Sequence, residues 1–263
     1  MAGMTLGGFI FLVALGILPS LAWLWYYLHK DNHPEPKRMV IAVFAYGFVS
    51  VAFAFGAEWL FVKALLGIST WCPTCTETVP WLLSALNISA TGAAVSFFVL
   101  STLAFIEEYV KYAAAKLRII QSKYFDEPVD AMIYLVVAAL GFAAAENIGY
   151  ILQNANHAID IAYFRFVSAT FLHALASAIV GYFLALSLAH ERGRGWYIAG
   201  GIGIATALHA LFNFLIMKTE QGGTQTATLL VFALMFSMFL TVSFLFEAVQ
   251  RLSLKPRPIT QSL

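Results

Sequence analysis

Residues 129–152 read VDAMIYLVVAALGFAAAENIGYIL, and this stretch decides the class of the fold. A helix that crosses a bilayer needs about 20 mostly apolar residues, and the stretch is long enough. Its apolar residues form a continuous run and do not alternate with polar ones, which favours a helix over a strand of a membrane barrel. Glu146 and Asn147 interrupt the run near its end. An ionisable group inside a membrane span costs free energy, so its presence there indicates a function.

Six further stretches of the chain have the same character. They are residues 5–28, 39–66, 91–115, 164–190, 196–217 and 226–250. Of the 263 residues, 61% are hydrophobic and only 11% are charged, whereas a soluble domain has about 25% charged residues. We therefore expect an all-α, polytopic membrane protein with seven transmembrane helices. The composition excludes a soluble enzyme and a disordered chain, and a net charge of +1 without a basic tract excludes a nucleic-acid-binding protein.

The distribution of Lys and Arg predicts the orientation in the membrane. Eleven of these residues fall in the connections 29–38, 116–128 and 191–195 and in the tail after residue 250, whereas the alternate connections carry only Lys218. Since positive residues accumulate on the cytoplasmic side, the N-terminus is predicted to lie outside and the C-terminus in the cytoplasm. We therefore expect a multi-pass protein of the cell membrane, in contact with the lipid bilayer.

Residues 1–263 are interpreted as one transmembrane helical domain, and the helices at about 91–217 are expected to form the core that holds its functional residues. The outer connection 67–90 is the longest and is predicted to contain a short interfacial helix. It also holds Cys72 and Cys75, the only cysteines of the chain. Two cysteines are too few for a structural zinc site, so a local disulfide or two free thiols are the alternatives.

Polar side chains gather in four consecutive spans. In chain order they are Glu107, Glu108, Lys111, Glu146, Asn147, His173, His209 and Asn213. Counting outward from the connections places Glu108 opposite Glu146, and it places His173 within about one helical turn of both Glu146 and His209. The cluster is therefore predicted to occupy one layer of the membrane.

Carboxylates and imidazoles in a shielded layer suit hydrolysis. A Glu can take a proton from water, and an imidazole or an Asn amide can orient that water or stabilise an oxyanion. The same residue types can bind zinc, with Glu146, His173 and His209 as candidate ligands. The alternatives are an ion- or proton-coupled transporter or channel that uses the layer as a relay, and a non-catalytic scaffold. Glu58 and Lys63 of the second span are interpreted as a separate structural ion pair.

Four motifs carry a resemblance to a known family. They are Glu107-Glu-Tyr-Val-Lys111 (EExxK), Phe142-Ala-Ala-Ala-Glu146-Asn147 (FxxxEN) followed by Tyr150, the single His173, and His209-xxx-Asn213. Over about residues 100–215 the chain resembles the PrsW family of intramembrane proteases, distant relatives of the CAAX prenyl endopeptidases. The resemblance implies a protease that cuts membrane-anchored proteins, such as anti-sigma factors. Glu146 stands where the CAAX relatives have His, and Asn213 where some members have Asp, so a metal-bound and a Glu-activated water both stay open.

The candidate site can be divided into roles. The candidate catalytic residues are Glu107, Glu108, Glu146, His173, His209 and Asn213, with Lys111 and Asn147 in support. The four-residue spacing of Glu107 and Lys111 favours an ion pair between them, which would occupy Glu107. Glu108 shares its helix face with small alanines, where a cavity has room. We therefore predict that Glu108 is the primary base and that Glu107 supports it.

Overall fold

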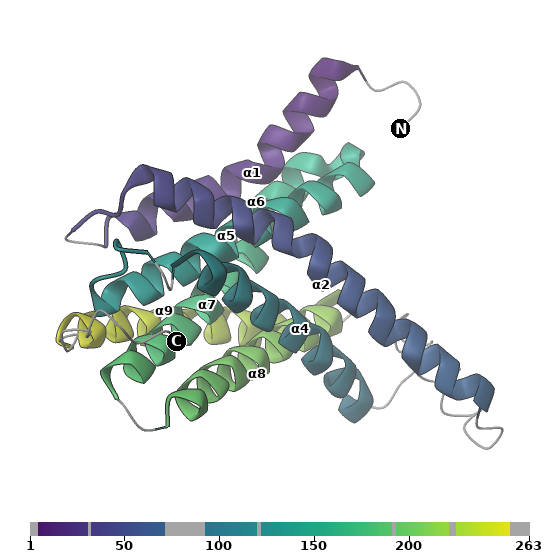
Figure 1. Cartoon of the computed structure of the whole chain (residues 1–263). Helices are drawn as coiled ribbons and strands as arrows, with labels where there is room; N and C mark the ends of the chain where they lie inside the picture. The colour runs from purple at the N-terminus through teal and green to yellow at the C-terminus, as the bar shows by residue number, and fades with distance from the viewer. Residues whose placement is uncertain are drawn as a thin grey trace.

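Helices form the framework of the described chain (Figure 1). The computed structural model describes residues 5–30, 33–71, 93–119, 122–190, 193–220 and 225–252. Its helices are α1 (Leu6–Leu28), α2 (Lys37–Trp71), α4 (Ala93–Ile119), α5 (Pro128–Gln153), α6 (Ala158–Val167), α7 (Ala169–Ala189), α8 (Arg194–Glu220) and α9 (Gln225–Gln250), with the 3₁₀ turn η2 (Ala155–His157) before α6. These residues contain no strand, so the predicted all-α fold is confirmed.

Most predicted spans match one helix to within a few residues, but the stretch 164–190 does not. Helix α6 ends at Val167 and α7 begins at Ala169, so the continuous helix predicted there is wrong. At Ser168 the backbone leaves the helical region, with φ −119° and ψ −95°. Its hydroxyl donates to the carbonyl of Phe164 at 2.7 Å, which satisfies a group at the end of α6.

Six segments of the described chain are long and apolar enough to cross a membrane. Helix α4 is a seventh helix of sufficient length but is not among them, and it carries Glu107, Glu108 and Lys111. Helices α6 and α7 count as one segment, residues 155–189. The protein is therefore a multi-pass membrane protein, with a charged helix among its apolar ones.

Helix α5 lies at the centre of the bundle, in contact with α1, α2 and α7 (Figure 1). Its apolar window is 94% buried, against 33% for α2. Glycines allow this close packing: a methyl group on Gly47 would overlap the carbonyl of Ala138, and one on Gly141 would overlap that of Phe44. Small residues at such crossings are typical of helix packing in membranes. The position of Glu146 is therefore set by a tightly held helix.

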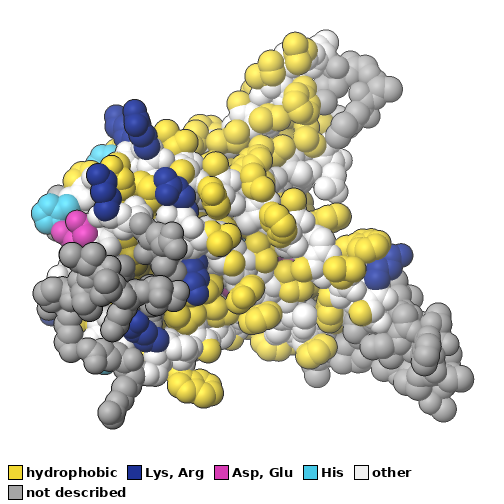
Figure 2. Space-filling view, viewed as in Figure 1, with side chains coloured by type: hydrophobic (Ala, Val, Ile, Leu, Met, Phe, Trp, Pro, Cys, Tyr) yellow, Lys and Arg dark blue, Asp and Glu magenta, His cyan; other side chains and the backbone are white. Residues whose placement is uncertain are grey.

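Lys and Arg side chains gather at one end of the molecule, at the left in Figure 2. The connections from α1 to α2, α4 to α5 and α7 to α8 lie at the same end, whereas the surface between the two ends is mostly apolar (Figures 1 and 2). This agrees with the prediction that the basic connections share one side of the membrane. That this side is cytoplasmic stays a prediction.

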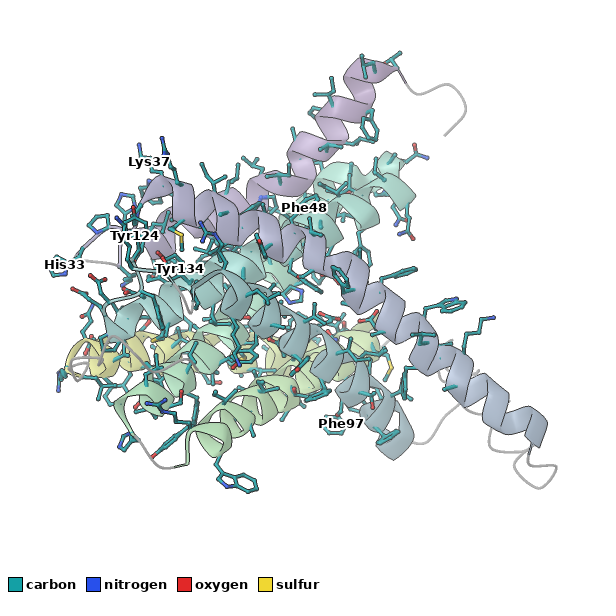
Figure 3. All side chains as sticks on the ribbon, in the orientation of Figure 1. His33, Lys37, Phe48, Phe97, Tyr124 and Tyr134 are labelled. Atoms are coloured by element: carbon teal, nitrogen blue, oxygen red, sulfur yellow. The ribbon has the colours of Figure 1, made fainter. Side chains whose placement is uncertain are left out.

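Polar contacts tie the start of α5 to the connection before α2. Tyr134 donates a hydrogen bond to Glu35, and His33 contacts Glu127 at 2.8 Å; Figure 3 labels Tyr134 and His33 at this end. The amide of Glu127 donates to Asp130 at 2.7 Å, in the first turn of α5. These contacts fix the end of the central helix.

The outer connection 67–90 was predicted to begin after residue 66, but α2 continues to Trp71. Cys72, Cys75 and the predicted interfacial helix lie outside the described residues, so their predictions are not tested.

Candidate active site

Four helices bring the predicted polar side chains together. The cluster consists of Glu107, Glu108 and Lys111 from α4, Glu146 from α5, His173 from α7 and His209 from α8. The rings of His173 and His209 lie 5.1 Å apart, centroid to centroid, at 84° to each other. The predicted convergence of Glu108, Glu146, His173 and His209 in one layer is confirmed.

Lys111 bonds to Glu108 and leaves Glu107 without this partner. Its Nζ donates to Oε1 of Glu108 at 2.6 Å and to Nδ1 of His173 at 2.9 Å. The side chain is fully buried and lies over the ring of Phe142, 5.1 Å from its centroid. The predicted pairing of Lys111 with Glu107 is therefore wrong. Both spacings are possible on a helix, and here the partners on α5 and α7 draw Lys111 to the side of Glu108.

Glu107 has a buried oxygen that faces both imidazoles. Its Oε2 lies 3.9 Å from Nδ1 of His173 and 3.8 Å from Nε2 of His209, and it has no hydrogen-bond partner. One oxygen or nitrogen atom from each of these three residues lies within 4.8 Å of the other two, which is an arrangement that can hold a metal ion. A buried carboxylate oxygen without a partner calls for a proton, a water or a cation.

In each imidazole, the nitrogen that is farther from Glu107 bonds to another carboxylate. Nε2 of His173 donates to Oε2 of Glu146 at 3.0 Å, and Nδ1 of His209 donates to Oε1 of Glu108 at 2.7 Å. Because an ionised carboxylate only accepts hydrogen bonds, these contacts assign the ring protons to the far nitrogens. The nitrogens nearer to Glu107 then carry lone pairs; that of His173 accepts from Lys111, and that of His209 lies 3.8 Å from Oε2 of Glu107. Such carboxylate-backed imidazoles are typical of metal ligands.

Arg165 of α6 is a site residue that the sequence analysis missed. It contacts Oε2 of Glu146 at 2.6 Å, donates to Oδ1 of Asn147 and lies over the ring of Tyr150 at 4.2 Å. Asn147 in turn donates to Oγ1 of Thr170 at 3.0 Å. A charged side chain within an apolar segment was the available signal, the same signal that identified Glu146. Arg165 holds Glu146 in place from outside the cluster.

The candidate metal ligands differ from the predicted set. The structure brings Glu107, not Glu146, together with the near nitrogens of His173 and His209. Glu146 instead lies behind His173, against Arg165.

Two other predicted residues also differ in their surroundings. Asn213 lies one turn after His209 and is half-buried, but it makes no hydrogen bond with the other predicted site residues. The predicted ion pair of Glu58 with Lys63 is wrong within the described part of the chain, because Lys63 lies over the ring of Trp59 at 5.6 Å. Glu58 is half-buried and close enough to Glu146 and Lys111 to interact with them electrostatically.

A catalytic zinc ion is usually held by three protein ligands and keeps one position open for water. Two imidazole nitrogens with lone pairs and one carboxylate oxygen without a partner match that donor set. The residues present therefore fit a metal, with Glu107, His173 and His209 as its ligands. The amino group of Lys111 can keep Glu108 as its partner when Nδ1 of His173 is engaged by another cation.

Comparisons with known proteins identify the family. The model of the PrsW family, described as intramembrane metalloproteases, matches residues 35–242, which include the whole cluster. Relatives named Protease PrsW are 28% identical over 213 residues in Geobacillus kaustophilus (81% of this chain, 82% of the relative) and 25% identical over 207 residues in Bacillus subtilis (78% and 82%). No solved structure matches the chain. These matches give the transporter alternative no support, and the chain belongs to the PrsW family of intramembrane proteases.

Proposed function

We propose that this protease cuts membrane-anchored proteins, anti-sigma-factor-like regulators among them, at the layer formed by Glu107, His173 and His209. The observation that carries the proposal is the convergence of an unpartnered carboxylate oxygen of Glu107 with one nitrogen of each of two buried imidazoles. Those three atoms would hold zinc, which supplies a Lewis acid for the scissile carbonyl and the attacking water.

The protein's own groups account for the proton. Glu107 is the base in this proposal. Lys111 and His209 both bond to Oε1 of Glu108, and although Oε2 of Glu108 also lacks a hydrogen-bond partner, it is Oε2 of Glu107 that lies against both imidazoles. When Oε2 of Glu107 is engaged, its Oε1 remains to take the proton from water. Glu108 and Glu146 orient the two imidazoles by accepting their far N–H groups. The proposed base therefore differs from the one that the sequence predicted.

We expect the purified protein in detergent to cut a peptide that contains a single transmembrane segment. Because zinc is part of the proposal, a chelator should stop cleavage and added zinc should restore it. Mass spectrometry of the fragments gives the cut position. If cleavage continues unchanged in a protein shown by elemental analysis to be free of metal, zinc is not required; if no transmembrane peptide is cut with zinc present, the hydrolytic proposal fails.

An apolar groove lies between α2 and α4, and we propose that the transmembrane segment of the substrate lies in it. The groove has a volume of about 590 Å³, and its α4 wall includes Val110, Ala113 and Leu117. Helices α2 and α4 run side by side, with the groove between them (Figure 1). Glu107 precedes Val110 by three residues, which places both on one face of α4. An apolar helix lying there would be beside the proposed base.

Replacing Ala113 with tryptophan is expected to reduce cleavage of a transmembrane substrate by about tenfold or more, because the indole would fill the groove without touching Glu107. Initial rates of peptide cleavage in detergent measure the effect. Ala52→Trp, on an exposed position of α2 outside the groove, is the matched control. Equal rates for both variants and the wild type would exclude the groove as the substrate path.

A further inference from the structure

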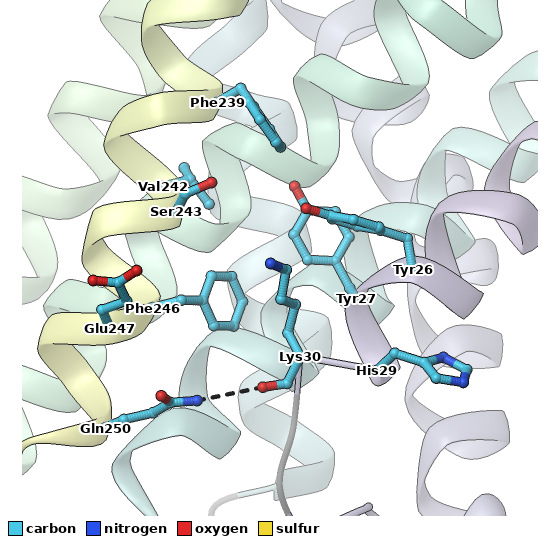
Figure 4. Close-up of a pocket in the computed structure, with 10 residues that line it drawn as sticks. All are labelled: Tyr26, Tyr27, His29, Lys30, Phe239, Val242, Ser243, Phe246, Glu247 and Gln250. Atoms are coloured by element: carbon cyan, nitrogen blue, oxygen red, sulfur yellow. Dashed lines mark hydrogen bonds between the residues drawn. The ribbon is translucent and has the colours of Figure 1, made fainter.

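A second pocket lies between the end of α1 and the C-terminal half of α9, and none of its lining residues belongs to the helices of the active site (Figure 4). Its volume is about 310 Å³, and polar and apolar groups both line it. It lies at the end of the molecule where Lys and Arg gather, beside the aromatic residues that close α1. Tyr and Trp at such positions are typical of the boundary between bilayer and water.

The wall of the pocket contains a hydroxyl group without a partner. Tyr27 is only 2% exposed, and its hydroxyl makes no hydrogen bond within the described chain. Its ring stacks against Phe246 of α9, with 5.9 Å between centroids, so the side chain is held in place. Buried hydroxyl groups usually have a partner. A ligand with an acceptor atom would supply one here.

Opposite charges stand on the two sides of the pocket. Lys30, just after α1, extends along Tyr26 with Nζ 5.3 Å from the ring centroid, and Glu247 projects from α9 (Figure 4). Within the described residues the two groups make no ion pair with each other. Gln250 donates to the carbonyl of Lys30 at 3.3 Å and so joins the two sides. The pocket therefore presents a cation and an anion separated by a space, which matches a zwitterion.

An exposed apolar stripe continues from the pocket along α9. Phe236, Leu240, Ser243 and Glu247 follow one another at intervals of four, three and four residues, so they share one helix face. Phe236 and Leu240 are 64% and 52% exposed. The polar end of this face lies in the pocket, and its apolar end is exposed on the surface of α9, a helix long and apolar enough to cross a membrane. A polar region next to an apolar one on the same helix face fits one amphiphile, with its headgroup at Glu247 and its acyl chains along Phe236.

We propose that this pocket binds the headgroup of an aminophospholipid of the phosphatidylethanolamine class. The phosphate accepts hydrogen bonds from the ammonium of Lys30 and the hydroxyl of Tyr27. The ammonium of the lipid donates to the carboxylate of Glu247. A choline headgroup has no N–H to donate, and a glycerol headgroup has no positive charge, so the site discriminates against both.

Native mass spectrometry of the purified protein tests the proposal with phosphatidylethanolamine, phosphatidylcholine and phosphatidylglycerol of the same acyl chains. We expect phosphatidylethanolamine to be retained about tenfold better than the other two, the difference that one charge-assisted hydrogen bond supplies. Equal retention of the three lipids would overturn the headgroup assignment. Binding of soluble phosphoethanolamine with the same affinity would overturn the assignment to a lipid.

Single substitutions test the residues. Tyr27→Phe, Lys30→Gln and Glu247→Gln should each reduce retention of phosphatidylethanolamine, and Glu247→Gln should also remove the preference over phosphatidylcholine. The matched controls are Tyr124→Phe and Lys37→Gln, which lie at the same end of the molecule but outside the pocket (Figure 3). Circular dichroism and gel filtration confirm that each variant is folded. A similar loss in the controls, or no loss in folded pocket variants, would refute the site.

Discussion

Replacing Glu107 with glutamine is expected to reduce peptide cleavage by about 10²–10⁴-fold, the usual effect of losing a general base. The amide keeps the shape of the side chain but cannot take a proton from water. Its oxygen is also a weaker ligand, so we expect the zinc content of the purified variant to fall as well. Initial rates with a transmembrane peptide and elemental analysis measure the two effects.

Glu108→Gln is the matched comparison, because the two residues are adjacent and both are buried. Glu108 only orients His209 and pairs with Lys111 in our proposal. Losing such a partner of a ligand typically costs about 10–100-fold in activity or metal affinity. The larger loss should therefore occur in Glu107→Gln. The reverse order, with Glu107→Gln close to normal, would restore Glu108 as the base.

Replacing His173 and His209 together with alanine is expected to remove bound zinc and to lower cleavage by about 10³-fold or more, since a Lewis acid contributes several kcal/mol. Only Glu107 of the three candidate ligands then remains. Elemental analysis of the purified protein and the thermal shift on adding zinc report metal binding without reference to activity.

The exposed histidines His157 and His190 provide the control for this pair. Their double alanine variant should keep its zinc and its activity, because both lie in connections and neither contacts the cluster. Wild-type zinc content in the folded His173/His209 variant would place the metal elsewhere.

The sequence predicts the helices well where an apolar run is continuous. Residues 129–152 differ from the bounds of α5 by one residue at each end. The break at Ser168 was not predicted, because neither Pro nor Gly marks it and the hydropathy does not change there. The break is seen in the backbone angles of Ser168, whose hydroxyl bonds back to Phe164, and apolar patterns do not report such features.

The sequence predicts which residues form the site better than it predicts which of them bond to one another. Depth follows from the lengths of the connections, so Glu108, Glu146 and the two histidines could be placed in one layer. The partner of Lys111 could not be predicted, because spacings of three and four residues are both allowed for an ion pair on a helix. The choice of Glu108 is made by tertiary contacts with His173 and Phe142. Arg165 was missed because it approaches Glu146 from a separate short helix, α6.

The burial of α5 also bears on how the protease admits a substrate. The backbones of α5 and α2 touch at Gly47 and Gly141, so neither helix can shift against the other without losing both contacts, because packed interfaces are bistable and do not deform continuously. Helices α2 and α4 border the groove, and only 33% of the apolar window of α2 is buried. Because α2 is held against α5, opening and closing of the groove must fall to α4, while Glu146 and its Arg165 partner stay still. Catalysis would thus combine a fixed pair of helices, α2 and α5, with a mobile α4 that carries Glu107.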